Sequence, residues 1–307
     1  MGDSTEGPRP AAAPAGAKTT ILTLHDKYRR GEPITMLTAY DYPTARALDE
    51  AGIDAILVGD SLAMVVLGHA STLSVTMEEM LHHARAVSRG AKRALLIGDM
   101  PFMSYQAEAA QAIRNAGRFL QESGMNAVKL EGGRTVAETV RAIVGAGIPV
   151  LGHIGLTPQS TNALGGYRVQ GRTAGTARSL VEDALALEAA GCFAVVVEGV
   201  PERVATYLTE RLAIPTIGIG AGAGVSGQVL VTHDLLGLYS ELTPRFVKRY
   251  ADLGQAMRTA FEAYRAEVAS RAFPTRDHAY AIAEDEWQSF LQEMRERGPR
   301  ALRSKRS

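Results

Sequence analysis

The chain has 307 residues, which is enough for one large α/β barrel or for two smaller domains. Its 33 Lys and Arg residues balance 33 Asp and Glu residues, so the net charge predicts no general attraction to nucleic acid or to an anionic membrane. Cys192 is the only cysteine, which excludes a disulfide framework. No apolar run approaches the ~18 residues that a membrane-spanning helix needs. We therefore expect a globular protein that has neither nucleic-acid nor membrane partners.

The first residues differ from the rest in composition. Residues 1–18 are dominated by Pro, Ala and Gly, and we expect them to form a disordered N-terminal tail. They lack the basic start and the apolar core of a secretory signal peptide. A cytoplasmic protein is therefore expected.

From residue 19 to residue 272, short apolar runs alternate with Ala-rich segments of helical spacing. Most runs are continuously apolar, as is typical of strands buried on both faces of a parallel sheet. The predicted strands are 34–40, 55–60, 94–99, 127–131, 149–153, 194–198, 215–220 and 229–233. The predicted helices include 77–93, 106–123, 135–146, 176–190 and 202–211, the first with a capping box formed by Thr76 and Glu79.

This alternation and this length favour a (β/α)8 TIM barrel over residues 19–272, with a doubly wound open sheet as the main rival. The interval between Gly220 and Val229 is too short for a crossover helix, so a loop or a broken helix is expected there. Residues 273–307 are predicted to add an amphipathic helix over 280–294 and a basic tail from Arg295 to Ser307.

Ionisable residues occur where several of the predicted strands end. In a barrel, the carboxyl ends of the strands meet at one mouth, and that is where chemistry takes place. Four carboxylates meeting there would repel one another, and the candidates for compensation are a divalent cation and a lysine. Oxygen ligands without a nearby Cys or His pair favour Mg²⁺ over Zn²⁺. The strand-end residues are Asp60, Asp99, Lys129, Glu131, His153 and Glu198.

The common sequence motifs of nucleotide-binding proteins and serine hydrolases are absent from this chain or lie in the wrong structural context. Residues 222–227 spell GxGxxG, but they lead into a predicted strand and not into a helix, which argues against a dinucleotide site. The sequence contains no GxxxxGK[ST] loop and no GxSxG elbow. Metal-assisted carbon chemistry fits the strand-end residues better.

The same strand ends lie in segments that closely resemble the ketopantoate hydroxymethyltransferase (3-methyl-2-oxobutanoate hydroxymethyltransferase) family. The similarity covers roughly residues 20–275, and its specificity comes from the order and spacing of eight segments. The segments are Thr38-Ala-Tyr-Asp-Tyr42, Val58-Gly-Asp-Ser61, Gly98-Asp-Met-Pro-Phe-Met103, Val128-Lys-Leu-Glu-Gly-Gly133, Gly152-His-Ile-Gly-Leu-Thr-Pro-Gln-Ser160, Gly165-Gly-Tyr-Arg-Val-Gln-Gly-Arg172, Val197-Glu-Gly-Val-Pro201 and Ile217-Gly-Ile-Gly-Ala-Gly222.

The resemblance implies a TIM barrel of the phosphoenolpyruvate/pyruvate-binding type, assembled as a homo-oligomer, commonly a decamer. It also implies an enzyme of pantothenate biosynthesis. That enzyme transfers a hydroxymethyl group from 5,10-methylenetetrahydrofolate to 3-methyl-2-oxobutanoate, through a Mg²⁺-stabilised enolate, to give 2-dehydropantoate. Ala70 and Ser226 stand where the family pattern leads us to expect Asp. The long segment Leu156–Arg172 is expected to close over the mouth.

Carried over by position, the resemblance assigns a role to each strand-end residue. Asp60 and Asp99 are implied as Mg²⁺ ligands, and Glu131 as the third carboxylate of the metal site, direct or through water. Asp60, Ser61, Asp99, Lys129 and His153 are implied to bind the substrate, with Ser61 and Lys129 at its carboxylate end. Glu198 is implied as the catalytic base.

The residues also allow three other interpretations to be compared with this one. Lys129 could form a Schiff base in a keto-acid aldolase, which borohydride trapping would reveal. A catalytically silent barrel would be expected to lack strand-end carboxylates, and this chain has them. A related C–C lyase would need a catalytic Cys at the mouth, whereas Cys192 precedes its strand and is predicted at the opposite end.

Overall fold

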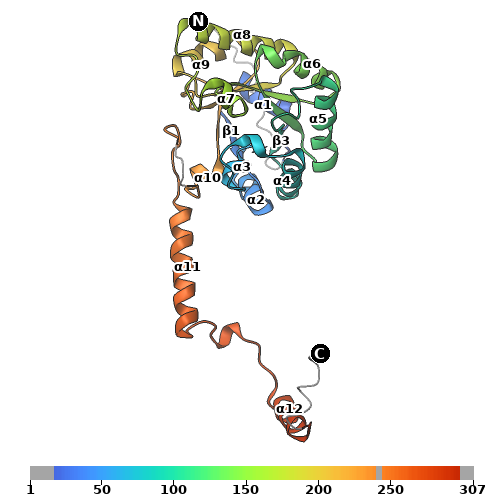
Figure 1. Cartoon of the computed structure of the whole chain (residues 1–307), viewed down its shortest axis with the longest axis vertical. Helices are drawn as coiled ribbons and strands as arrows, with labels where there is room; N and C mark the ends of the chain where they lie inside the picture. The colour runs from blue at the N-terminus through green and yellow to red at the C-terminus, as the bar shows by residue number, and fades with distance from the viewer. Residues whose placement is uncertain (1–16, 240–243, 298–307) are drawn as a thin grey trace, which may run out of the picture. The chain divides into compact units, whose positions relative to one another are not determined.

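The computed structural model describes residues 17–239 and 244–297 (Figure 1). Its strands form one closed parallel barrel in chain order. Closure comes from the pairing of the first strand with the last, which excludes the open doubly wound sheet. The strands are β1 Ile34–Thr38, β2 Ala55–Val58, β3 Leu95–Asp99, β4 Ala127–Glu131, β5 Val150–Gly155, β6 Ala194–Glu198, β7 Thr216–Ile219 and β8 Gly227–Leu230. Apart from its last two residues, the predicted tail 1–18 lies outside the described residues.

Two apolar layers hold the barrel together. Successive strand residues point to opposite faces, so alternate positions fill the barrel interior and the intervening ones pack against helices. Leu95 and Ile97 belong to the inner cluster, whereas Leu96 of the same strand packs in the outer one. The strands β2, β3 and β4 are buried at every position. Accordingly β2 is wholly apolar and β3 has no polar side chain before Asp99, whereas β4 carries Lys129 and Glu131.

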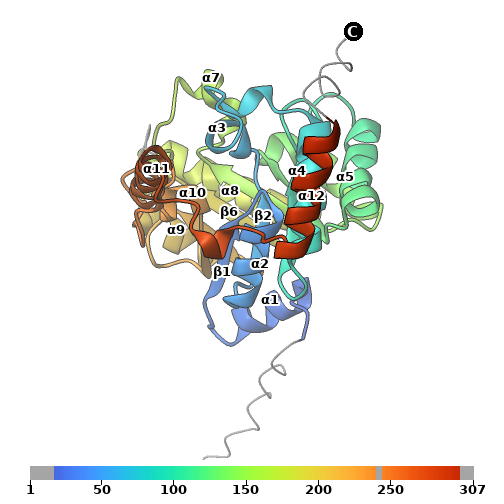
Figure 2. The same ribbon diagram turned by 90° about the horizontal axis from the view of Figure 1, so that it is seen from below.

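Helices surround these strands (Figures 1 and 2). The predicted capping box is present in α4, where Thr76 Oγ1 accepts the backbone N–H of Glu79 and Glu79 Oε2 accepts that of Thr76. Most predicted helices end or begin within a few residues of the observed bounds. The α-helices of this part are α1 Ile21–Arg29, α2 Tyr42–Glu50, α3 Leu62–Val65, α4 Met77–Gly90, α5 Ala109–Ser123, α6 Ala137–Gly145, α7 Thr161–Leu164, α8 Ala174–Ala190, α9 Glu202–Thr209 and α10 Thr232–Leu235. The short 3₁₀ turns are η1 Thr72–Ser74, η2 Arg134–Val136 and η3 Pro158–Ser160.

The eighth strand begins earlier than its apolar residues suggested. It starts at Gly227, and the predicted end at 233 is wrong because the helix α10 begins at Thr232. Gly227 is required by close packing, since a Cβ there would lie 2.4 Å from the carbonyl oxygen of Ile34. Ser226 stands where Asp was expected, and its hydroxyl accepts a hydrogen bond from the backbone N–H of Thr216 (3.1 Å). The loop expected before this strand is present.

The C-terminal part begins earlier than the predicted boundary at residue 272. The chain divides into one compact unit that ends at Asp252 and a second that begins at Leu253. The second unit contains α11 Leu253–Ser270, which was not among the predicted helices, the turn η4 Arg276–His278, and α12 Glu284–Arg297. The predicted helix 280–294 is therefore shifted by a few residues. Of the predicted basic tail, residues 298–307 lie outside the described residues.

None of the helices in the described part of the chain combines the length and the hydropathy of a membrane span.

Gly98 on β3 provides a test of the packing of the outer apolar layer. A Cβ at Gly98 would lie 2.4 Å from the ring of the buried Phe119 on α5. We expect Gly98→Ala to lower the free energy of unfolding by about 1–3 kcal/mol, as overpacking does. Gly117→Ala is the matched control, because its Cβ meets nothing within 4 Å in the middle of α5, and it should stabilise by about 0.5–1 kcal/mol. Urea unfolding measures both, and equal effects would contradict this account.

Candidate functional site

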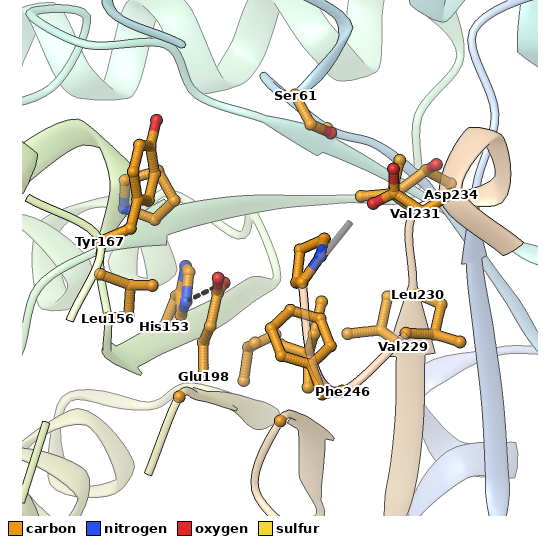
Figure 3. A pocket seen from close by; sticks show the side chains of 18 of the residues that line it. Ser61, His153, Leu156, Tyr167, Glu198, Val229, Leu230, Val231, Asp234 and Phe246 are labelled. Carbon is orange, nitrogen blue, oxygen red and sulfur yellow. Dashed lines mark ion pairs between the residues drawn. The ribbon is translucent and has the colours of Figure 1, made fainter. Parts of the chain in front are cut away.

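The strand-end side chains predicted from the sequence meet in one cavity of about 940 Å³ at the carboxyl end of the barrel (Figure 3). The alternation along each strand brings them there. Asp99 continues the inward-facing series of β3, and Lys129 and Glu131 continue that of β4. His153 and Glu198 do the same on β5 and β6, while Asp60 follows the end of β2 by two residues. The inner apolar layer therefore ends in a layer of charged groups.

Lys129 is the central cation of this layer. Its Nζ donates to both carboxylate oxygens of Asp99 at 2.8 Å and lies 3.7 Å from Glu131 Oε1. Burial alone would lower the pKa of Lys129, but Asp99, Glu131 and Asp60 outweigh it, so this pKa is raised and the side chain is an ammonium. The ammonium only partly compensates its partner, since burial still raises the pKa of Asp99.

Asp60 is the carboxylate of this layer whose pKa is raised most strongly. Burial raises its pKa well above the usual range, and the nearby charges of Asp99 and Glu131 add to this effect. The Asp60 backbone N–H donates to Asp99 Oδ2 (3.1 Å), which keeps the two residues adjacent. The site thus holds more negative charge than its own cations can neutralise.

His153 lies between two glutamates. Its Nδ1 is 3.3 Å from Glu131 Oε1 and its Nε2 is 3.2 Å from Glu198 Oε2, ion-pair distances without the alignment of full hydrogen bonds. Burial and Lys129 lower the pKa of His153, but the two glutamates outweigh them and raise it to about 9. Burial opposes ionisation of Glu131, yet His153 and Lys129 hold the pKa of that carboxyl below its usual value. At neutral pH the ring is therefore an imidazolium between two carboxylates.

Ser61 faces the same cavity from the turn after β2. Its hydroxyl is 2.8 Å from the hydroxyl of the buried Tyr40, which follows β1. In Figure 3, Ser61 lies across the cavity from His153 and Glu198. The structure therefore brings every site residue predicted from the sequence to one place.

Sequence reasoning missed Gln159, the residue that ties the carboxylates together. Its Nε2 donates to Asp60 Oδ2 (3.0 Å), and its backbone N–H donates to Glu131 Oε2 (2.9 Å). Its Oε1 accepts from the hydroxyl of Tyr105 (2.8 Å), which itself accepts the backbone N–H of Glu131 (3.1 Å). Gln159 lies in the turn η3 within the long segment that follows β5. Neither periodicity nor charge marks a lone amide in such a segment as buried.

The donor set fits Mg²⁺. Among the described residues, no group of three His, Cys, Asp or Glu side chains is arranged as a complete metal site. Mg²⁺ does not need one, because it is usually held by one or two carboxylates together with water and substrate oxygens. Asp60 and Asp99 supply two adjacent carboxylates, and Glu131 Oε1 is buried without a hydrogen-bond partner. A divalent cation would also compensate the charge that raises the pKa of Asp60.

Two of the alternative interpretations lose support from this geometry. Schiff-base formation needs a neutral amine, whereas Lys129 is an ammonium paired with Asp99. Cys192 is buried between α8 and the start of β6, at the end of the barrel opposite the cavity, and burial raises the pKa of its thiol to about 12. Neither residue is suited to act as a nucleophile at neutral pH.

Comparison with known proteins points to one family. The sequence model of a family described as ketopantoate hydroxymethyltransferase matches residues 18–276, so α12 lies beyond the match. A 3-methyl-2-oxobutanoate hydroxymethyltransferase of Clostridium novyi is 55% identical over 267 residues, which cover 87% of this chain and 97% of the relative. A protein of the same name from Oleidesulfovibrio alaskensis is 60% identical over 273 residues, which cover 88% of this chain and 94% of the relative.

Solved structures share the fold at low sequence identity. A 2,3-dimethylmalate lyase of the PEP mutase/isocitrate lyase superfamily has a TM-score of 0.56 at 17% identity, covering 89% of this chain and 98% of that chain. A phosphonopyruvate hydrolase in complex with oxalate and Mg²⁺ has a TM-score of 0.54 at 15% identity, covering 90% and 96%. These likenesses support the barrel predicted from the sequence.

The raised pKa of Asp60 gives a testable stability effect. A carboxyl whose pKa is higher in the folded than in the unfolded chain binds more protons when folded, so stability falls as pH rises between those two values. We expect Asp60→Asn to raise the free energy of unfolding of the EDTA-treated protein by about 1 kcal/mol at pH 7, and by less near pH 4, while abolishing turnover. Urea unfolding at the two pH values measures this.

Asp49→Asn is the matched control. Burial opposes ionisation of Asp49, but its carboxylate accepts the backbone N–H groups of Ala94, Lys92 and Arg93, and its pKa is lowered. This variant should therefore lose about 1–3 kcal/mol at pH 7. If Asp60→Asn destabilises the protein as much as Asp49→Asn does, the surplus of negative charge inferred at the barrel mouth is wrong.

Proposed function

This chain belongs to the ketopantoate hydroxymethyltransferase family, and from that premise we propose that it uses Mg²⁺ and 5,10-methylenetetrahydrofolate for its reaction. The family reaction transfers a hydroxymethyl group to 3-methyl-2-oxobutanoate. The product is then 2-dehydropantoate, and the transfer belongs to pantothenate biosynthesis. The observation that carries the proposal is the cluster of buried carboxylates around Lys129, at the end of a cavity with room for two ligands.

Asp60 and Asp99 would hold the cation, with Glu131 as a third carboxylate that acts directly or through water. When bound, Mg²⁺ supplies a Lewis acid for the negative charge that develops on the keto oxygen. The choice of ion is supported by the oxygen-only donors, and by a protein of the same fold that was solved with Mg²⁺ and oxalate. Lys129 and Ser61 would contact the carboxylate end of the keto acid.

Glu198 would take the proton from C3 of the keto acid, which is acidified by the adjacent ketone. Its side chain is 15% exposed, compared with 1% for Asp99 and 2% for Glu131, so it is the carboxylate of the three that a bound substrate can reach best. His153 would act as an active-site helper, because its imidazolium holds Glu198 in one orientation. Glu131 is held by Gln159 and Lys129, so it is not available as a base.

The segment after β5 would limit water access to the reacting atoms. Tyr167, Arg168 and Val169 line the cavity from this segment. The hydroxyl of Tyr167 lies 3.7 Å from the sulfur of Met64, which belongs to the helix α3 after β2. In Figures 1 and 2, α3 lies beside α7, the short helix that precedes Tyr167 in the chain. A cover over the mouth would protect the carbanion from protonation by solvent.

Membership of the family also indicates how the enzyme is assembled and where it is located. We propose a homo-oligomer, a decamer, in the cytoplasm. Within the second unit, Phe261 and Tyr264 of α11 are 62% and 60% exposed, and such apolar side chains are what a contact between subunits would bury. Light scattering coupled to size exclusion should give about ten times the mass of one chain. A monomer at all concentrations would contradict the decamer.

The role of Glu198 can be tested without folate. We expect Glu198→Gln to slow exchange of the C3 proton of 3-methyl-2-oxobutanoate with deuterium by about 10²–10⁴-fold, because the amide cannot accept the proton. Proton NMR in D₂O with Mg²⁺ follows the exchange, and calorimetry checks that the variant still binds the keto acid. Exchange at the wild-type rate would remove Glu198 as the base. Borohydride trapping of a covalent adduct would instead support Lys129 as a Schiff-base lysine.

A further inference from the structure

The cavity is larger than the keto acid needs. Pockets of about 300–1,000 Å³ hold drug-sized molecules, and this cavity of about 940 Å³ has to accommodate a five-carbon acid at its charged end. The outer walls differ in chemistry from that end, since their side chains are mainly apolar. The apolar lining includes Leu156, Val169, Val200, Ile219, Val231 and Phe246. This outer part has the size and the walls for a flat, largely apolar second ligand.

Asp234 is the carboxylate of this outer part. It lies on α10, directly after β8, and in Figure 3 it is beside Val231 on the side of the cavity opposite His153 and Glu198. Its side chain is half-buried, and its carboxylate accepts no hydrogen bond from any residue that the structure describes. Burial raises its pKa to about 6, although the positive charge of Arg249 opposes this. A carboxylate placed in this way is stabilised by a ligand that donates hydrogen bonds to it.

Arg168 and Arg245 line the cavity at exposed positions, one in the segment after β5 and the other after α10. Within residues 17–239 and 244–297, neither side chain forms an ion pair or a hydrogen bond. Guanidinium groups bind carboxylates with two parallel hydrogen bonds. We call the entrance of the cavity, where Arg168 and Arg245 lie, the rim. It is suited to a ligand whose outer end is anionic.

We propose that the outer half of the cavity is the folate site, in which Asp234 binds the 2-amino-4-oxopyrimidine edge of the pterin and Arg168 and Arg245 bind the carboxylates of the glutamate tail. This inference rests on the proposed function. The pyrimidine edge presents two adjacent N–H donors, which match the two oxygens of one carboxylate. The apolar walls would contact the faces of the pterin and the aminobenzoyl ring.

The charges of the cavity also determine the orientation of the ligand. The cation and the keto acid would occupy the inner end, so the dicarboxylate tail would find its cationic partners in the two arginines at the entrance of the cavity. The pterin then lies inside, with the one-carbon unit that it carries toward the keto acid. This is the orientation that carbon–carbon bond formation needs.

Asp234→Asn separates folate binding from keto-acid chemistry. An amide offers one acceptor where the carboxylate offers two, and we expect the KM for 5,10-methylenetetrahydrofolate to rise about 10–100-fold, as loss of a hydrogen bond to a charged group does. Folate-independent exchange of the C3 proton should stay within about twofold of wild type, which also shows that the variant is folded. Glu202→Gln is the matched control, because Glu202 lines the same cavity but accepts the backbone N–H of Ala223. The control should leave the folate KM unchanged.

The arginines are tested with a shortened ligand. Arg168→Ala and Arg245→Ala should each raise the KM for methylenetetrahydrofolate about tenfold and leave that for methylenetetrahydropteroate, which lacks the glutamate, unchanged. Both residues are exposed, so these variants should fold even if Asp234→Asn does not.

The outcomes distinguish this inference from the proposed function. Wild-type protein without C3 exchange and without folate-dependent turnover would overturn the proposed function. Normal exchange with an unchanged folate KM in Asp234→Asn would overturn the pterin contact alone. Arginine variants that weaken the folate and the pteroate ligand equally would overturn the assignment of the rim.

Discussion

An excess of buried negative charge at the carboxyl end of the barrel is the constraint on which the rest of this structure depends. Asp60, Asp99, Glu131 and Glu198 converge there, and the protein supplies Lys129 and the imidazolium of His153 against them. The raised pKa of Asp60 is the sign that this compensation is incomplete. A site of this kind costs stability in the free protein and becomes favourable when a cation and an anionic substrate complete it.

The barrel can carry this cost because its stability comes from elsewhere. The inner apolar layer is continuous below the charged groups, and the outer layer between strands and helices is separate from it. Residues outside the strands contribute to the positioning of the polar groups. Gln159 and Tyr105 hold the backbone of Glu131 and the carboxylates around it by direct hydrogen bonds. The strands therefore determine where the charges are, and their orientation comes from Lys129 and His153 on the strands together with the segments that follow them.

The parts of the site that the sequence predicted are those that follow from strand periodicity. The strands Ala127–Glu131 and Ala194–Glu198 were predicted to the residue, because short, mainly apolar runs that end in a charged residue are typical of buried strands. The convergence of Asp99, Lys129, His153 and Glu198 then follows from barrel geometry. Gln159 and Asp234 could not be found in this way, since each lies in a short element after a strand where no period operates. The start of β8 was missed because Gly227 is not apolar. The helix α11 was not among the predicted helices, although Leu253, Met257, Phe261 and Tyr264 recur along it at helical spacing.

The central claim is that the strand-end carboxylates form a cation-dependent site for the keto acid. Calorimetric titration of 3-methyl-2-oxobutanoate into the protein, with Mg²⁺ and then with EDTA, tests it most directly. The account predicts binding with Mg²⁺ and no measurable binding with EDTA, because the buried carboxylates oppose the anionic keto acid unless a cation compensates their charge. Equal affinity with and without Mg²⁺ would contradict it.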